Sequence, residues 1–160
     1  MRFVVDTVAS PAQARGALTD FTDRRLRTWS RSLDPRTYEL RDQGPTWSVA
    51  RESTAGSPFW VVVRYDWSDP DVVRWTTVDS SYGGGGTGTV RITPRDGGGS
   101  RLHVEYDHTG PQRQKVALFL ITHLPMGRYI RRLWTQSLDR YARTSETDEG
   151  DPADGAHGVP

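Results

Sequence analysis

Residues 37–109 alternate between apolar and polar positions with a period of two, which is typical of strands that have one buried face. Six segments of this region are rich in β-branched and aromatic residues: 37–43, 46–53, 59–67, 72–80, 87–94 and 101–109. The connections between them are short and full of turn residues, so they permit hairpins and leave no room for crossover helices. With a further strand over residues 1–8, the pattern predicts a seven-stranded antiparallel sheet.

Helical signals precede most of these strands. Ser10 can cap a helix that begins at Pro11, because serine is a favoured N-cap and proline fits the first helical position. This helix is predicted over residues 11–18. A second short helix is predicted over residues 20–29, with Thr19 or Asp20 as its cap.

The last predicted element is a long amphipathic helix over residues 112–143. Its apolar stripe recurs at steps of three and four residues, as expected of a helix with one buried face. The stripe consists of Val116, Leu120, His123, Gly127, Ile130, Trp134, Leu138 and Tyr141. Pro125 and Gly127 are expected to kink or break this helix near its middle. The order of elements predicts an α+β fold.

The stretch GGGGTG at residues 83–88 matches the G-x-G-x-x-G pattern of dinucleotide-binding proteins. In those proteins the last glycine opens a helix, whose N-terminal amides bind the pyrophosphate. Here Gly88 is followed by TVRITP, which predicts a strand, and no helical pattern begins for more than twenty residues. We therefore interpret residues 82–88 as a flexible hairpin loop and a plain connector.

The composition indicates one domain with an acidic extension. A chain of 160 residues with six tryptophans is long enough to bury a substantial core. Residues 144–160 hold five acidic residues and no basic one, whereas residues 1–143 hold 21 basic and 15 acidic residues, a net charge of +6. We expect a single domain over residues 1–143 and a disordered acidic tail over residues 144–160.

Several classes of site and location are disfavoured. The chain has no cysteine, which excludes disulfides and thiolate metal ligands, and His103 and His108 would point to opposite faces of a strand. We therefore expect no metal and no cofactor. No stretch approaches the roughly 20 apolar residues of a membrane-spanning helix, and the N-terminus lacks the apolar core of a signal peptide. A soluble, cytoplasmic protein without a membrane span is expected.

Three stretches, read with this order of elements, resemble a known superfamily. Residues 4–30 (VVDTVASPAQARGALTDFTDRRLRTWS) resemble its opening strand and helix pair. Residues 51–80 and 90–109 resemble its central strands. The superfamily is the START-like, or SRPBCC, group, which includes the Bet v 1-type allergens and bacterial polyketide cyclase/dehydrase proteins. The resemblance covers residues 2–142 and includes no diagnostic catalytic motif.

The resemblance implies a helix-grip fold, in which a curved seven-stranded antiparallel sheet wraps around the long C-terminal helix. Two short helices would lie between the first two strands, and a cavity would lie between sheet and helix. Strand alternation then predicts which side chains face this cavity. The expected inward sets include Trp47, Val49 and Arg51; Phe59, Val61, Val63, Tyr65 and Trp67; Val90 and Ile92; and Leu102, Val104, Tyr106 and His108.

For residues 72–80 the choice stays open between the face with Trp75 and Asp79 and the face with Arg74 and Val78. The complete set of candidate ligand-binding residues is Trp47, Arg51, Tyr65, Trp75, Asp79, Tyr106, His108, Leu120, His123 and Trp134.

The resemblance implies binding of a hydrophobic small molecule, lipid- or polyketide-like, in the cavity. The first alternative is a polyketide aromatase/cyclase-type enzyme, for which His123 or His108 would act as a base and Arg51 or Tyr65 as a hydrogen-bond donor. His123 and Arg51 are the leading catalytic candidates.

The second alternative is a ribosome- or RNA-associated protein that uses the arginines of residues 24–31 and 128–132. Since no aromatic residues interleave with them as in RNA-binding platforms, nucleic acid is not expected as a partner. Monomer and homodimer both stay open.

Overall fold

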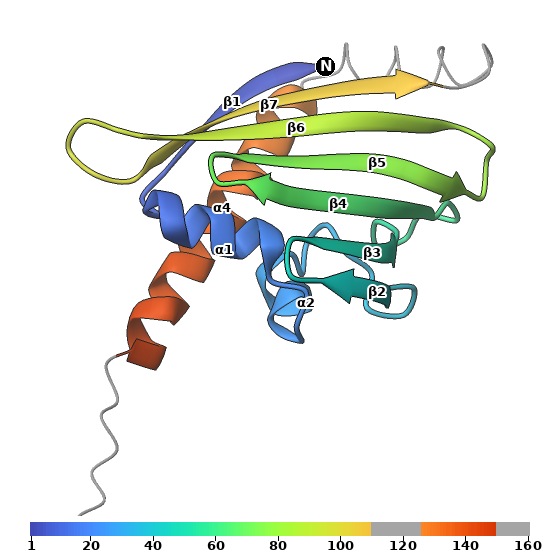
Figure 1. Ribbon diagram of the computed structural model, residues 1–160, viewed down its shortest axis with the longest axis horizontal. Helices are drawn as coiled ribbons and strands as arrows, with labels where there is room; N and C mark the ends of the chain where they lie inside the picture. The colour runs from blue at the N-terminus through green and yellow to red at the C-terminus, as the bar shows by residue number, and fades with distance from the viewer. Residues whose placement is uncertain (110–125, 150–160) are drawn as a thin grey trace, which may run out of the picture.

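The computed structural model describes residues 1–109 and 126–149 of the chain (Figure 1). Within these residues, seven strands form one sheet: β1 (Arg2–Thr7), β2 (Glu39–Gly44), β3 (Trp47–Glu52), β4 (Val61–Asp69), β5 (Val72–Ser80), β6 (Gly85–Pro94) and β7 (Ser100–Thr109). The helices are α1 (Pro11–Thr19), α2 (Arg24–Thr28) and α4 (Met126–Glu149).

The sheet has the strand order β1-β7-β6-β5-β4-β3-β2, and every neighbouring pair is antiparallel. From β2 to β7, each strand therefore pairs with the next one in the sequence. The N-terminal β1 closes the far edge by pairing with β7. Together with α1 and α2 between the first two strands, this arrangement confirms the predicted helix-grip fold (Figure 1).

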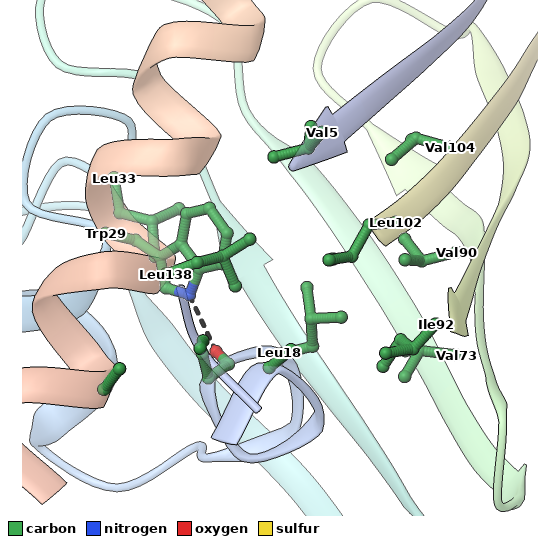
Figure 2. Packing of buried hydrophobic residues seen from close by; sticks show 14 residues of the cluster. Val5, Leu18, Trp29, Leu33, Val73, Val90, Ile92, Leu102, Val104 and Leu138 are labelled. Atoms are coloured by element: carbon green, nitrogen blue, oxygen red, sulfur yellow. Dashed lines mark hydrogen bonds between the residues drawn. The ribbon is translucent and has the colours of Figure 1, made fainter. Parts of the chain in front are cut away.

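Residues from α1, α4 and the inner face of the sheet form one hydrophobic core. Figure 2 shows Val90 and Leu102 on the strands pointing toward Leu18 of α1, with Trp29 and Leu138 beyond it. The indole of Trp29 also donates a hydrogen bond of 2.9 Å to the carbonyl oxygen of Ala17 (Figure 2). The buried members are Val5, Ala9, Ala14, Ala17, Leu18, Trp29, Leu33, Val73, Val90, Ile92, Leu102, Val104, Leu138 and Ala142.

The beginning of α1 confirms the sequence signal. The Ser10 side chain accepts a hydrogen bond from the Gln13 backbone, while the Gln13 side chain accepts one from the Ser10 backbone. This reciprocal pair is a capping box, which satisfies two backbone N–H groups that would otherwise lack partners. Pro11 occupies the first helical position, where its missing N–H costs nothing.

Helix α4 forms hydrogen bonds with the end of β1 and with the residues at the end of α2. Asp139 accepts hydrogen bonds from the Thr7 hydroxyl at 2.5 Å and from the Val8 backbone at 3.1 Å. Arg140 donates to the Arg27 carbonyl oxygen at 3.1 Å and to the Ser30 hydroxyl at 2.8 Å. These contacts hold α4 against β1 on one side and against the end of α2 on the other.

The limits of α4 differ from the predicted ones. The helix continues to Glu149, so it includes the first six residues of the segment predicted as a tail. The predicted helical residues 112–125 and the tail residues 150–160 lie outside the described residues. None of the described helices has the length and apolar composition needed to cross a membrane.

The glycine run includes the predicted hairpin turn between two strands, but the turn is shorter than the predicted loop over residues 82–88, because most of the run is strand. Only Gly83 adopts a positive φ, of 68°, in the turn, and β6 already begins at Gly85. Gly86 and Gly88 are buried strand residues that face the inside of the fold, opposite His108 and Tyr106 of β7.

Two aromatic rings explain why these inward positions are glycines. A Cβ added at Gly88 would overlap two ring carbons of Trp75, on the neighbouring strand β5. At Gly86 it would lie 2.7 Å from the Tyr106 hydroxyl and 2.6 Å from the Asp107 carbonyl oxygen. The rings of Trp75 and Tyr106 are nearly parallel, with an interplanar angle of 17° and centroids 6.2 Å apart. The missing side chains therefore let both rings lie against β6.

We predict that Gly88→Ala destabilises the protein, because the new methyl group must displace the Trp75 ring. Overpacking of this kind costs about 1–3 kcal/mol of unfolding free energy, measurable by urea denaturation. Gly85→Ala is the matched control, since its Cβ would lie 3.6 Å from the nearest atom, an ordinary contact. We expect Gly85→Ala to be neutral or slightly stabilising, and equal effects at both positions would contradict the explanation.

Candidate functional site

A cavity of about 190 Å³ lies between the region of α2, the strands β3 to β5, and α4; we call it the inner cavity. Three tryptophans, Trp29, Trp75 and Trp134, supply much of its wall. Trp29 and Trp134 meet edge to face, with ring centroids 5.3 Å apart. The other described lining residues are Leu18, Arg25, Ser32, Leu33, Glu52, Tyr65 and Val73.

The charged residues of the inner cavity form a buried ion pair. Arg25 of α2 donates from Nε and Nη2 to Oε1 of Glu52 on β3, at 2.9 and 2.8 Å. The Arg25 and Glu52 side chains are only 5% and 10% exposed, so water screens the pair much less than it would an exposed pair. Arg25 Nη1 also donates to the Leu18 carbonyl oxygen at 3.4 Å.

Two aromatic residues, Tyr65 and Phe21, contact this ion pair. The Tyr65 hydroxyl on β4 donates a hydrogen bond of 2.7 Å to Oε2 of Glu52. The Arg25 guanidinium lies 4.0 Å from the ring centroid of Phe21 and 5.0 Å from that of Tyr65. Cation–π contacts of this kind are strengthened when the cation is desolvated. Both oxygens of the Glu52 carboxylate are thereby engaged. We refer to Arg25, Glu52 and Tyr65 as the polar cluster.

The polar cluster shifts the pKa of two of its members. Burial is the largest single effect on the Arg25 guanidinium and lowers its pKa, but the charge of Glu52, its hydrogen bond to Arg25 and the nearby Tyr65 and Tyr38 together outweigh burial and leave the pKa above its usual value. For the Tyr65 phenol, burial is the largest cause and the Glu52 charge adds to it, so the pKa lies well above its usual value. At neutral pH Arg25 is therefore charged and Tyr65 is a neutral hydrogen-bond donor.

A second cavity, of about 300 Å³, adjoins the first; we call it the outer cavity. Ser32, Leu33 and Glu52 line both cavities, so Glu52 is the member of the polar cluster that lies where the two meet. The other described residues of the outer cavity are Ser53, Thr54, Ser57, Phe59 and Val61. Phe59 is 57% exposed, which indicates that this cavity lies at the surface.

Three predicted site residues line the inner cavity: Tyr65, Trp75 and Trp134. Tyr106 and His108 face inward on β7, as predicted; the Tyr106 ring lies beside Trp75, and the His108 ring lies beside Tyr106. They are not among the described lining residues of either cavity. Leu120 and His123 lie outside the described residues, so their predicted contacts with a ligand stay predictions.

The predicted inward face of β3 was wrong, which removes Trp47 and Arg51 from the cavity. Ser48 and Ala50, not their neighbours, are fully buried, and Ser48 pairs with the inward Tyr65. Arg51 instead lies 4.5 Å from the Trp60 ring on the outer face. Trp47 lies on that face too, where the Arg64 guanidinium is 4.5 Å from its ring. The catalytic candidate Arg51 therefore points away from the inner cavity.

Asp79 was also misplaced, because β5 is not regular along its length. Trp75 pairs with Tyr65 and faces inward, which settles the open choice for this strand. A register shift follows, since Val63 pairs with Thr77 but Val62 pairs with Asp79. A bulge of this kind reverses the alternation beyond it. Asp79 is therefore exposed and lies on the opposite face from Trp75.

The sequence reasoning missed Arg25, Glu52, Trp29 and Ser32. Arg25 was grouped with the surface arginines of residues 24–31, but it is buried in the ion pair. Arg31 forms a hydrogen bond with Gln136 of α4, so part of this basic segment holds the helices together. A usable signal was the pair of small residues Ser48 and Ala50, which alternate with Glu52 on one face of β3 and are fully buried opposite Tyr65 and Val63.

A family model described as "Polyketide cyclase / dehydrase and lipid transport" matches residues 1–146. No curated protein matches the chain. Among solved structures, a protein of Thermus thermophilus aligns with a TM-score of 0.67 at 15% identity, over 91% of this chain and 97% of that one.

The ZhuI aromatase/cyclase of Streptomyces sp. R1128 aligns with a TM-score of 0.66 at 15% identity, over 91% of this chain and 94% of that one. A START superfamily protein of Mycobacterium smegmatis aligns with a TM-score of 0.62 at 13% identity, over 91% and 97%. At sequence identities of 13–15%, these similarities show a shared fold.

We predict that Glu52→Leu destabilises the protein by about 3–5 kcal/mol, because it leaves the Arg25 charge buried without a partner. The double variant Arg25→Met/Glu52→Leu should recover most of this loss, since it removes both desolvated charges. Urea denaturation measures both. As a control, Glu105→Leu breaks an exposed pair with Arg2 and should cost no more than about 1 kcal/mol. No recovery in the double variant would contradict the assignment.

The raised pKa of Tyr65 predicts a loss of stability in base. The unfolded chain releases this proton near pH 10, the usual value, whereas the folded protein keeps it. The contribution of Tyr65 is therefore complete below pH 10 and is lost as the pH rises through its folded pKa. Between pH 9 and 11, the unfolding free energy should fall more steeply in the wild type than in Tyr65→Phe, by up to about 1.4 kcal/mol per pH unit. The exposed Tyr129→Phe should keep the wild-type slope.

Proposed function

The chain belongs to the polyketide cyclase/dehydrase and lipid transport family, and from this premise we propose that it binds a hydrophobic small molecule in the inner cavity. The observation that carries the proposal is the composition of the cavity wall. Tryptophan, leucine and valine side chains form most of it, while Arg25, Glu52 and Tyr65 are gathered in one cluster. Ligand pockets typically combine an apolar wall with a few polar groups that set the orientation of the ligand.

The volumes limit the size of the bound group. A cavity of about 150 Å³ holds benzene, so the inner cavity of about 190 Å³ suits a ring-sized group. A larger ligand would extend past Glu52 into the outer cavity of about 300 Å³. The two cavities together fall within the range of about 300–1,000 Å³ that is usual for small-molecule sites. A lipid-like or polyketide-like compound fits this shape.

A second candidate function is a cyclase- or dehydratase-type enzyme that uses the same cavity. The observation in its favour is the Tyr65 hydroxyl, a hydrogen-bond donor at the cavity wall that lies 2.7 Å from a carboxylate oxygen. A similar structure, ZhuI, is an aromatase/cyclase. This candidate differs from simple binding because it requires turnover of a ligand. Our proposal further includes a cytoplasmic location and a monomer or homodimer, which are expectations from the sequence.

We predict that the protein binds the neutral dye N-phenyl-1-naphthylamine and that Ser32→Phe weakens this binding at least about tenfold. Ser32 lines both cavities, so a phenyl ring at this position would block their junction. Fluorescence titration measures the affinity, and circular dichroism checks that the variant is folded.

Thr76→Phe is the matched control for Ser32→Phe, because Thr76 is exposed and pairs with Arg64 on the outer face of the sheet. It should bind the dye as the wild type does. Equal weakening by both variants, or no binding to the wild type, would contradict the proposed site. Native mass spectrometry of the purified protein provides an independent measurement, since a copurified hydrophobic compound should be lost from Ser32→Phe.

A further inference from the structure

We propose that the site selects ligands whose polar group is uncharged and can donate a hydrogen bond, such as a phenol or an alcohol, over the corresponding carboxylates. This inference rests on the proposed binding function and names the class of ligand for the same cavity. The relevant feature is the polar cluster of Arg25, Glu52 and Tyr65 in the inner cavity, whose Glu52 lies at the junction with the outer cavity.

The first step is the charge of the junction. Among the described lining residues of both cavities, Arg25 and Glu52 are the only ones with charged side chains. They bind each other through two hydrogen bonds of 2.9 and 2.8 Å, so the positive charge of Arg25 is already matched. A ligand carboxylate would meet a neutral pair and no free cation. Its desolvation would therefore have no compensating ion pair.

The second step is the hydrogen-bonding capacity that the polar cluster leaves open. A carboxylate offers about four acceptor positions, and Glu52 uses three of them, for Arg25 Nε, Arg25 Nη2 and the Tyr65 hydroxyl. One acceptor position is left for a ligand O–H group. The Ser32 hydroxyl donates to the Trp29 carbonyl oxygen at 3.1 Å and keeps its own acceptor positions. The junction thus has acceptor positions for a ligand O–H group, while the discrimination against anions comes from the charge balance of the ion pair.

The third step is the position of that donor in the ligand. Trp29, Trp75 and Trp134 surround the apolar part of the inner cavity, whose volume of about 190 Å³ suits a small ring system. Glu52 lies where this space meets the outer cavity. A ring in the inner cavity that carries a hydroxyl group can therefore place its hydroxyl at Glu52, while any longer substituent continues into the outer cavity.

The test compares matched naphthalene compounds in competition with N-phenyl-1-naphthylamine at pH 7. At this pH 2-naphthol is neutral and 2-naphthoate is ionised, since phenols titrate near 10 and carboxylic acids near 4. We expect 2-naphthol to displace the dye at concentrations at least about tenfold lower than 2-naphthoate. The methyl ether 2-methoxynaphthalene, which has no O–H donor, should also be weaker than 2-naphthol.

Two variants connect the preference to the polar cluster. Glu52→Gln removes the charge that neutralises Arg25, so 2-naphthoate should gain at least about tenfold relative to 2-naphthol. Arg25→Met/Glu52→Leu should bind 2-naphthol and 2-methoxynaphthalene equally, and it keeps the test valid if Glu52→Gln does not fold. Glu39→Gln, which alters an exposed pair with Arg41, is the control and should keep the wild-type preference.

The outcomes separate the inference from the function on which it rests. Dye binding with equal or stronger competition by 2-naphthoate in the wild type would overturn the preference and leave the binding function intact. An unchanged preference for 2-naphthol over 2-methoxynaphthalene in Arg25→Met/Glu52→Leu would also overturn it, because the polar cluster would then not be its cause. Failure of the wild type to bind the dye would overturn the binding function itself.

Discussion

The arrangement of the candidate site depends on one buried ion pair, between Arg25 and Glu52. Helix α2 has only five residues, too few to be stable without tertiary contacts. The bonds from Arg25 to Glu52 attach it to β3, and the cation–π contact with Phe21 holds the preceding turn. Trp29, Ser32 and Leu33 follow α2 directly and line the inner cavity. The same ion pair therefore positions one wall of the cavity and supplies its charged residues.

A second constraint comes from the absence of side chains at Gly86 and Gly88. Glycine weakens a strand, because it loses more conformational freedom on folding than other residues do. In this sheet the glycines allow two aromatic rings to approach the strand closely. Trp75 occupies the space that a Cβ of residue 88 would need, and Tyr106 occupies the space that a Cβ of residue 86 would need. Trp75 also lines the inner cavity. The glycines of β6 thus determine how far an aromatic wall residue extends into the space available for a ligand.

The fold was largely predictable from the sequence, because its signals are local. Alternation predicted all the strands, and the Ser10–Pro11 step predicted the start of α1. The inward sets of β6 and β7 were correct, and so was that of β4, except that Phe59 lies before the strand and is exposed. The site was less predictable because it depends on distant partners. On β3, Glu52 faces inward and Arg51 faces outward. The inward Glu52 is paired with Arg25, which lies 27 residues earlier in the chain. The bulge that turns Asp79 to the outer face arises from the pairing of β4 with β5. The glycines of β6 are explained only by aromatic rings on the neighbouring strands.

The ion pair also limits the chemistry that the described residues can perform. General acid–base catalysis is most effective with a group that titrates near the working pH. The pKa of Arg25 is raised above an already high value, and burial raises that of Tyr65, so both groups keep their protons at neutral pH. Arg25 and Tyr65 are therefore fixed hydrogen-bond donors at this pH. These groups therefore suit recognition better than proton transfer, and a buried pair with no net charge favours neutral ligands for the same reason.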